Sequence, residues 1–98
     1  MTERQEERIE LEPALKAPAA EALLATLKDN RGVDLTLDGS KVTFLSGACL
    51  QVLLSAMETW RADGVSLAIS APSDELKLDA AILGAADMLN FRSEEVAQ

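Results

Sequence analysis

The sequence predicts one two-layer α/β domain, with a mostly parallel sheet of about four strands and helices on one face. Three segments alternate apolar and polar residues with period two, which is typical of half-buried strands: 8–12, 33–38 and 65–70. The helical segments between them are long enough to connect parallel strands. Because Glu, Asp, Thr and Ser fill the alternate strand positions, we expect one face of the sheet to stay open to water.

The first helix is predicted from Pro18 to about Asn30, between the first two strands. Pro18 lies in the first turn, where the missing N–H costs no hydrogen bond, and Gly32 follows the helix end. Leucines at 23, 24 and 27 supply an apolar stripe. This helix is expected to be scaffold.

The second helix is predicted from about Gly47 to Asp63 and should be the principal core helix. Its apolar residues recur at spacings of three and four: Leu50, Leu53, Leu54, Met57 and Trp60. Trp60 continues this stripe, so we interpret it as a core residue rather than a partner anchor.

A last helix is predicted after the Ala71-Pro72 pair, with Ser73 as its N-cap and acidic residues in its first turn. Gly84 separates it from a terminal segment, 85–91. We expect a charged N-terminal tail over 1–7, a single domain over 8–91 and a C-terminal tail over 92–98.

The charge and composition exclude several classes of function. With 17 acidic and 9 basic side chains the formal charge is −8, which repels phosphate backbones and argues against nucleic acid as a partner. Histidine is absent, so histidine-dependent nucleophilic catalysis is excluded. No ligand motif suits a metal or cofactor, and we expect Glu10, Glu12, Asp34 and Asp38 to form a solvated face. We predict no catalytic site, no metal and no cofactor.

The lone Cys49 lies in an apolar run, and we expect a buried, inert thiol in a reducing compartment. No apolar stretch approaches the roughly 20 residues that cross a bilayer. The chain is therefore expected to be cytoplasmic, without membrane insertion.

The turn Leu45-Ser46-Gly47-Ala48 is the predicted working surface, because it leads into a helix N-terminus where backbone N–H groups are exposed. Ser46 is either the N-cap of that helix, which we favour, or a phosphorylation site. Gly47 and Ala48 are small either so that a partner can approach or because the turn packs against neighbouring strands. We predict that the partner-binding residues are Ser46, Gly47, Ala48 and Gln51.

Residues 34–38, Val42, the short turn and the Leu50-Gln51-Val52-Leu53-Leu54 run resemble the STAS domain family. The resemblance extends from about Ile9 to Phe91 and implies the STAS fold. Stand-alone STAS proteins of this length resemble anti-sigma factor antagonists, which bind a kinase-like partner and are switched by phosphorylation of a serine that follows an Asp.

The chain departs from that pattern at the phosphorylated serine. An ungapped alignment on Leu50–Leu54 puts Ser46 at the Asp position, Gly47 at the serine and Cys49 at the glycine. A shift of one residue would make Ser46 the acceptor, but Leu45 would then replace the Asp. We prefer the ungapped version.

The turn and the segment 59–64 are more similar to small STAS proteins of bacterial chemotaxis systems, the CheS-like group. This similarity implies a module that binds a CheA-type histidine kinase and modulates response-regulator dephosphorylation. The alternative is an anti-sigma factor antagonist that binds an anti-sigma factor kinase and is controlled by phosphate on Ser46. A third hypothesis is the STAS subunit of a lipid-transport ATPase complex.

Overall fold

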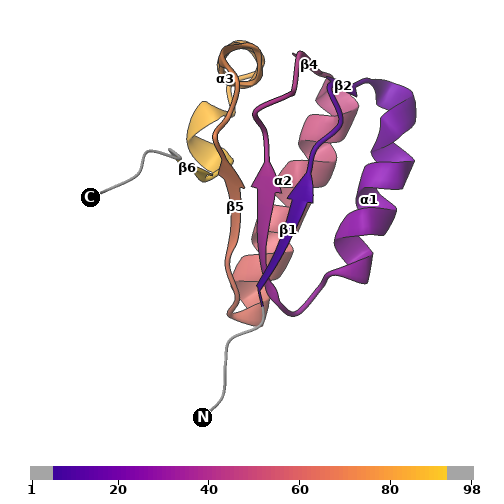
Figure 1. Cartoon of the computed structure of the whole chain (residues 1–98), viewed down its shortest axis with the longest axis vertical. Helices are drawn as coiled ribbons and strands as arrows, with labels where there is room; N and C mark the ends of the chain where they lie inside the picture. Colours follow the sequence, from indigo (N-terminus) through magenta and orange to yellow (C-terminus); the bar gives the residue numbers. More distant parts are fainter. Residues whose placement is uncertain (1–5, 93–98) are drawn as a thin grey trace.

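The main sheet has four parallel strands in the order β1-β3-β5-β6 (Figure 1). The computed structural model describes residues 6–92. The strands are β1 (Glu6–Glu10), β3 (Asp34–Asp38), β5 (Leu67–Ser70) and β6 (Phe91–Arg92). The predicted fold class, a mostly parallel sheet with helices against it, is confirmed.

Two helices cover one face of the sheet, and a third lies beyond the carboxyl ends of the strands. In Figure 1, α2 (Gly47–Asp63) lies behind the sheet, α1 (Ala20–Asp29) stands to the right of β1, and α3 (Asp74–Ile82) lies at the upper end of the sheet. Short 3-10 turns precede α1 and follow α3, η1 (Ala17–Ala19) and η2 (Ala86–Met88). The carboxyl end of β3 therefore approaches the start of α3, where the Gly39 carbonyl accepts the Ser73 N–H at 3.1 Å.

The register of the strands separates an apolar face from a polar face. The row that faces the helices is Ile9, Leu37, Ile69 and Phe91. The next row, on the opposite face, is Glu10, Asp38, Ser70 and Arg92. Because side chains alternate between faces along each strand, the period-two pattern in the sequence becomes one packed face and one polar face.

The helix α2 begins and ends where the sequence predicts. Gly64 ends it in the left-handed conformation, with φ of +76°, which glycine adopts without a Cβ penalty. Trp60 is buried, and its Nε1–H donates to the Val33 carbonyl at 2.7 Å, so its assignment to the core is confirmed. The buried face of α2 differs from the predicted apolar stripe. Leu54 and Met57 are only partly buried, whereas Ala56 is buried.

Several boundaries differ from the sequence prediction. β1 begins at Glu6, so Glu6 and Glu7 belong to the sheet rather than to the predicted tail over 1–7; the rest of that tail lies outside the described residues. Pro18 lies in the 3-10 turn η1, and the α-helix starts only at Ala20. The strand predicted over 65–70 begins at Leu67, because Val65 and Ser66 still belong to the connection from α2.

The sequence prediction missed three very short strands. β2 (Ala14–Leu15) pairs with β4 (Phe44–Leu45) as a separate two-stranded sheet, and β6 extends the main sheet beside β5. Asn90 directs the chain into β6 through a positive φ of +49°, and its side-chain amide donates to the Leu67 carbonyl. Two-residue strands have no detectable period, so only the pairing reveals them.

Candidate functional site

The turn that leads into α2 is closed by Ser46. The Ser46 Oγ accepts the Cys49 N–H at 3.2 Å, and the Ser46 carbonyl accepts the Leu50 N–H at 2.9 Å. Ser46 is thus the N-cap, as we favoured. Cys49 is fully buried, and its Sγ lies 3.3 Å from the Lys16 carbonyl, to which it donates. The predicted burial of the thiol is confirmed.

The four predicted partner-binding residues lie together at the N-terminus of α2, where Ser46 is the N-cap and Gln51 the fifth helical residue. Gly47, Ala48 and Gln51 are exposed and Ser46 is half-buried. Their proximity is a fact of the fold, whereas their role in binding a partner stays a prediction.

Gly47 is not required by the fold. A Cβ at this position would meet no heavy atom within 4 Å. Its φ is also outside the positive range, in which only Gly32, Gly64 and Gly84 are found among the described glycines. The hypothesis that Gly47 is small because it packs against neighbouring strands is therefore wrong, whereas the approach of a partner at this glycine stays a prediction.

An apolar groove that the sequence does not reveal lies beside this turn. It has a volume of about 320 Å³ and is lined by Phe44, Leu45, Ser46, Gly47, Asp79, Ile82 and Leu83. Ile82 is 72% exposed, Phe44 45% and Leu83 44%. We call the residues that line this groove, together with Ala48 and Gln51, the docking surface. Phe44 and Ile82 are far apart in the sequence, so no local pattern predicts that they share one surface.

Hydrogen bonds from α3, from its N-cap and from the connection between β1 and β2 hold the chain segment that presents Phe44. The Leu45 N–H donates to the Asp79 carboxylate on α3 at 2.9 Å. The Thr43 N–H donates to the Pro13 carbonyl at 2.7 Å, and the Ser73 hydroxyl donates to the Val42 carbonyl. These hydrogen bonds hold the backbone beneath the docking surface in place.

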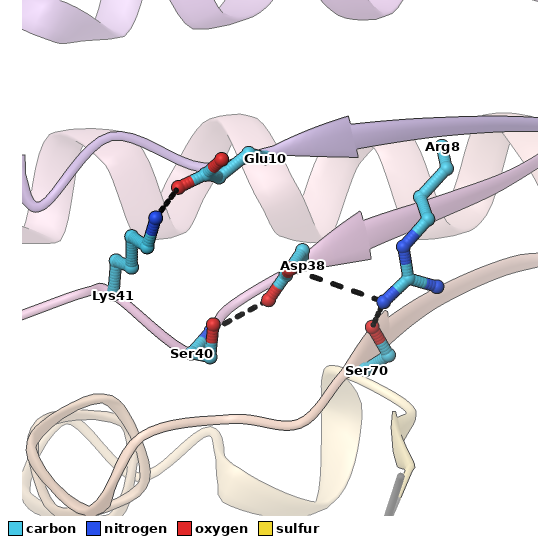
Figure 2. A network of polar contacts seen from close by, with 6 residues as sticks. All are labelled: Arg8, Glu10, Asp38, Ser40, Lys41 and Ser70. Carbon is cyan, nitrogen blue, oxygen red and sulfur yellow. Dashed lines mark hydrogen bonds and ion pairs between the residues drawn. The ribbon is translucent and has the colours of Figure 1, made fainter.

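A polar network on the open face of the sheet fixes the start of the same segment (Figure 2). Asp38 accepts the Ser40 N–H at 2.9 Å and lies 3.9 Å from the Arg8 guanidinium, which also donates to Ser70 at 3.2 Å. Lys41 pairs with Glu10 at 3.0 Å. The acidic residues at the ends of β1 and β3 thus anchor the loop that follows β3.

The expectation of a fully solvated acidic face needs correction. Asp34 is only 5% exposed, and its carboxylate accepts the Ser66 N–H at 2.9 Å. Glu10 and Glu12 are exposed, as expected, and Asp38 is half-buried with the partners named above. Within residues 6–92, no group of three or more His, Cys, Asp or Glu side chains is arranged to hold a metal ion.

We expect Asp38 to make the stability of the domain depend on pH. The Ser40 N–H, with smaller contributions from Arg8 and Lys41, holds the pKa of the Asp38 carboxyl below its usual range. A lowered native pKa gives stability that is present above the unfolded value of about 3.9 and lost as the pH falls through the native pKa. Urea unfolding should therefore show a stability gap between the wild type and Asp38→Asn at pH 7 that narrows at pH 3. An equal difference in the free energy of unfolding at both pH values would contradict this role. So would a control variant at an exposed carboxylate, Glu12→Gln, that shows the same narrowing.

Comparison with known proteins identifies the family. The family model described as "Mlab, STAS domain" matches residues 1–90, and the chain belongs to the STAS domain family. Among solved structures, the anti-sigma factor antagonist SpoIIAA in its unphosphorylated form has the same fold, with a TM-score of 0.71 and 15% sequence identity. That match covers 97% of this chain and 84% of SpoIIAA. No curated protein sequence matches the chain.

The family match confirms the STAS family that the sequence predicts. Neither this family model nor the SpoIIAA structure is described as a chemotaxis protein. Within residues 6–92 no helix has both the length and the apolar character that crossing a membrane requires.

Proposed function

We propose that the chain is a non-enzymatic protein-interaction domain of the anti-sigma factor antagonist type, which binds a kinase-like partner protein through the docking surface. The observation that carries this proposal is the exposed apolar groove of Phe44, Ile82 and Leu83 beside the exposed Gly47. Contiguous apolar side chains on the surface of a small acidic protein mark an interaction site. The fold shared with the antagonist SpoIIAA supports this class of partner.

The docking surface combines three properties that suit protein binding. Its apolar side chains supply area to bury, the N-terminus of α2 supplies backbone N–H groups and a positive dipole end, and Gly47 admits close approach of the partner's backbone. The net charge of −8 further favours a partner with a basic surface. Association should therefore slow as salt is added, and a salt-independent association rate would contradict the electrostatic part of the proposal.

Control by phosphate on Ser46 is the regulatory alternative within this class. The Ser46 hydroxyl is half-buried and accepts the Cys49 N–H as a cap, and the ungapped alignment places Gly47 at the acceptor position. We therefore expect binding that does not depend on phosphorylation. Incubation with ATP and the purified anti-sigma factor kinase, followed by intact mass, should show no added phosphate. One added phosphate that disappears in Ser46→Ala would establish the switch instead.

The second candidate partner is a chemotaxis histidine kinase of the CheA type, with modulation of response-regulator dephosphorylation as the outcome. The observation that favours it is Gly47 at the acceptor position, where neither packing nor backbone conformation requires a glycine. The STAS subunit of a lipid-transport ATPase complex is the third candidate. Neighbouring genes for a sigma factor, for a chemotaxis kinase or for a transport ATPase would favour the first, second or third in turn.

The proposal is tested by calorimetric titration of the domain into each purified candidate partner from the same genome. We expect saturable binding to the anti-sigma factor kinase that is lost in Gly47→Arg. Binding to the chemotaxis kinase and not to the anti-sigma factor kinase would identify the second candidate as the partner. Binding that Gly47→Arg leaves unchanged would contradict the docking surface for any of the three partners.

A further inference from the structure

Exposed apolar side chains gather at one end of the domain, on α3, its C-cap and β4. Of the six large apolar side chains that are exposed within residues 6–92, four lie there: Phe44, Leu78, Ile82 and Leu83. Figure 1 shows α3 and β4 side by side at the upper end of the sheet. Leu78 and Ile82 are one helical turn apart, at 60% and 72% exposure, so they form an uncovered apolar stripe beside the groove of the docking surface. Apolar side chains that gather in this way indicate a contact with another protein.

The backbone of β4 has no N–H group left for an added strand. The N–H groups of residues 43–46 all donate within the domain, at distances between 2.7 and 3.3 Å, to the Pro13 carbonyl, the Asp79 carboxylate and the Leu15 carbonyl. A strand that paired with β4 would need such donors. The backbone of a helix satisfies itself, and only its side chains have to enter the groove. A helix is therefore the occupant that suits this groove.

The charge beside the groove favours a basic helix. Asp74 pairs with Lys77 at 3.8 Å, which leaves Glu75 and Asp79 as the acidic residues of α3 that pair with no cation within residues 6–92. They are one helical turn apart, and Asp79 lines the groove. Asp79 accepts the Leu45 N–H, but a backbone amide does not cancel the charge of the carboxylate. A lysine or arginine on the occupant would therefore meet two carboxylates.

The same charges argue against two other occupants. A second copy of the chain would bring a net charge of −8 and the same two carboxylates to the contact, so the copies would repel each other. An anionic membrane surface attracts basic segments and would likewise be repelled by α3. A basic helix of a partner protein has neither disadvantage.

We infer that the groove between β4 and α3 binds an amphipathic helix of the partner. Apolar side chains of that helix, at spacings of three and four, pack against Phe44, Ile82 and Leu83, and a lysine or arginine lies against Glu75 and Asp79. The inference rests on the proposed function for the place where the partner binds, and it adds the kind of segment that binds there.

A synthetic peptide tests the inference without the kinase. The peptide has about 15 residues, the length at which an alanine-based helix begins to form, with leucines at spacings of four and three and lysines beside them. Titration into the ¹⁵N-labelled full chain should shift the amide signals of residues 44–47 and 75–83. A peptide of the same composition with the leucines two residues apart has no apolar helical face, and we expect its affinity to be at least about tenfold lower. A peptide with glutamate in place of lysine should also bind more weakly.

Three variants place the peptide on the chain. Ile82→Ser should lower its affinity at least about tenfold, because a large apolar contact is lost. Glu75→Lys should lower it at least about threefold at low salt. Leu24→Ser on α1 is the matched control: Leu24 is 39% exposed and lies outside the groove, so the affinity should not change. Urea unfolding of each variant shows whether the fold is retained.

Several results would overturn the inference. They are the absence of peptide binding, equal binding of the peptide without an apolar face, and amide shifts that leave residues 44–47 and 75–83 unchanged. Binding of the chain to phosphatidylcholine vesicles that Ile82→Ser abolishes would also overturn it, because the apolar stripe would then contact lipid.

The kinase separates this inference from the proposed function. If Gly47→Arg abolishes kinase binding while Ile82→Ser and Glu75→Lys leave it unchanged, the docking surface stands and the helix in the groove is overturned. If Ile82→Ser weakens the peptide but no candidate kinase binds, the groove accepts a basic helix and the proposed class of partner is wrong.

Discussion

Gly47→Arg is expected to weaken binding of the partner at least about a hundredfold, because the new side chain projects from the centre of the docking surface. The same substitution should change the free energy of unfolding by no more than about 0.5 kcal/mol. A Cβ at Gly47 has open space around it. Arginine gains about 0.8 kcal/mol over glycine in helix propensity and loses a similar amount as a cation at a helix N-terminus, so the two effects offset each other.

Ala62→Arg is the matched control for this prediction. Ala62 lies on the same helix and is exposed, but at the end opposite to the docking surface. Calorimetry and urea unfolding on both variants should show full binding by Ala62→Arg and none by Gly47→Arg, at equal stability. Full binding by both variants would remove the α2 N-terminus from the interface.

Gly39→Val should destabilise the domain by about 3 kcal/mol, because a core that is already filled accepts added carbons only with strain. A Cβ at Gly39 would lie 2.8 Å from Leu76 Cδ2, 3.0 Å from Ile69 Cγ2 and 3.4 Å from Pro72 Cα. The backbone here is also pinned, since the Gly39 carbonyl accepts the Ser73 N–H at 3.1 Å. The absence of a side chain is what lets the end of β3 approach the start of α3.

Gly47→Val is the matched control for Gly39→Val, because the same side chain is added where no atom lies within 4 Å. Urea unfolding of the two variants isolates the effect of packing from the loss of glycine flexibility. We expect Gly47→Val to be as stable as the wild type. Similar stabilities for the two variants would show that β3 and α3 can separate at little cost, and that the backbone beneath the docking surface is not fixed.

The parts of the fold that the sequence predicts are those set by local chemistry. The bounds of α2 follow from the Ser46 cap and from Gly64, whose φ of +76° ends the helix. The polar alternation along β3 similarly predicts a sheet covered on one face. β6 could not be predicted, because its two residues form a strand only through their pairing with β5.

The candidate site likewise has one group of residues that local sequence patterns predict and another group that only the fold brings together. Ser46, Gly47, Ala48 and Gln51 are adjacent to a helix start, which sequence patterns identify. The apolar half of the docking surface is formed by β4 and the end of α3, and the Asp79 carboxylate that joins them acts across a sequence separation of 34 residues. Such a contact follows from the way α3 crosses the carboxyl ends of the strands, which one sequence does not specify.

The central claim is that the partner binds at the docking surface, and hydrogen–deuterium exchange of the domain with and without its purified kinase partner tests it most directly. We predict slowed exchange over residues 44–51 and at the end of α3, with the C-terminal half of α2 unchanged. Slowed exchange that leaves residues 44–51 and α3 unaffected, while the partner is fully bound, would contradict it.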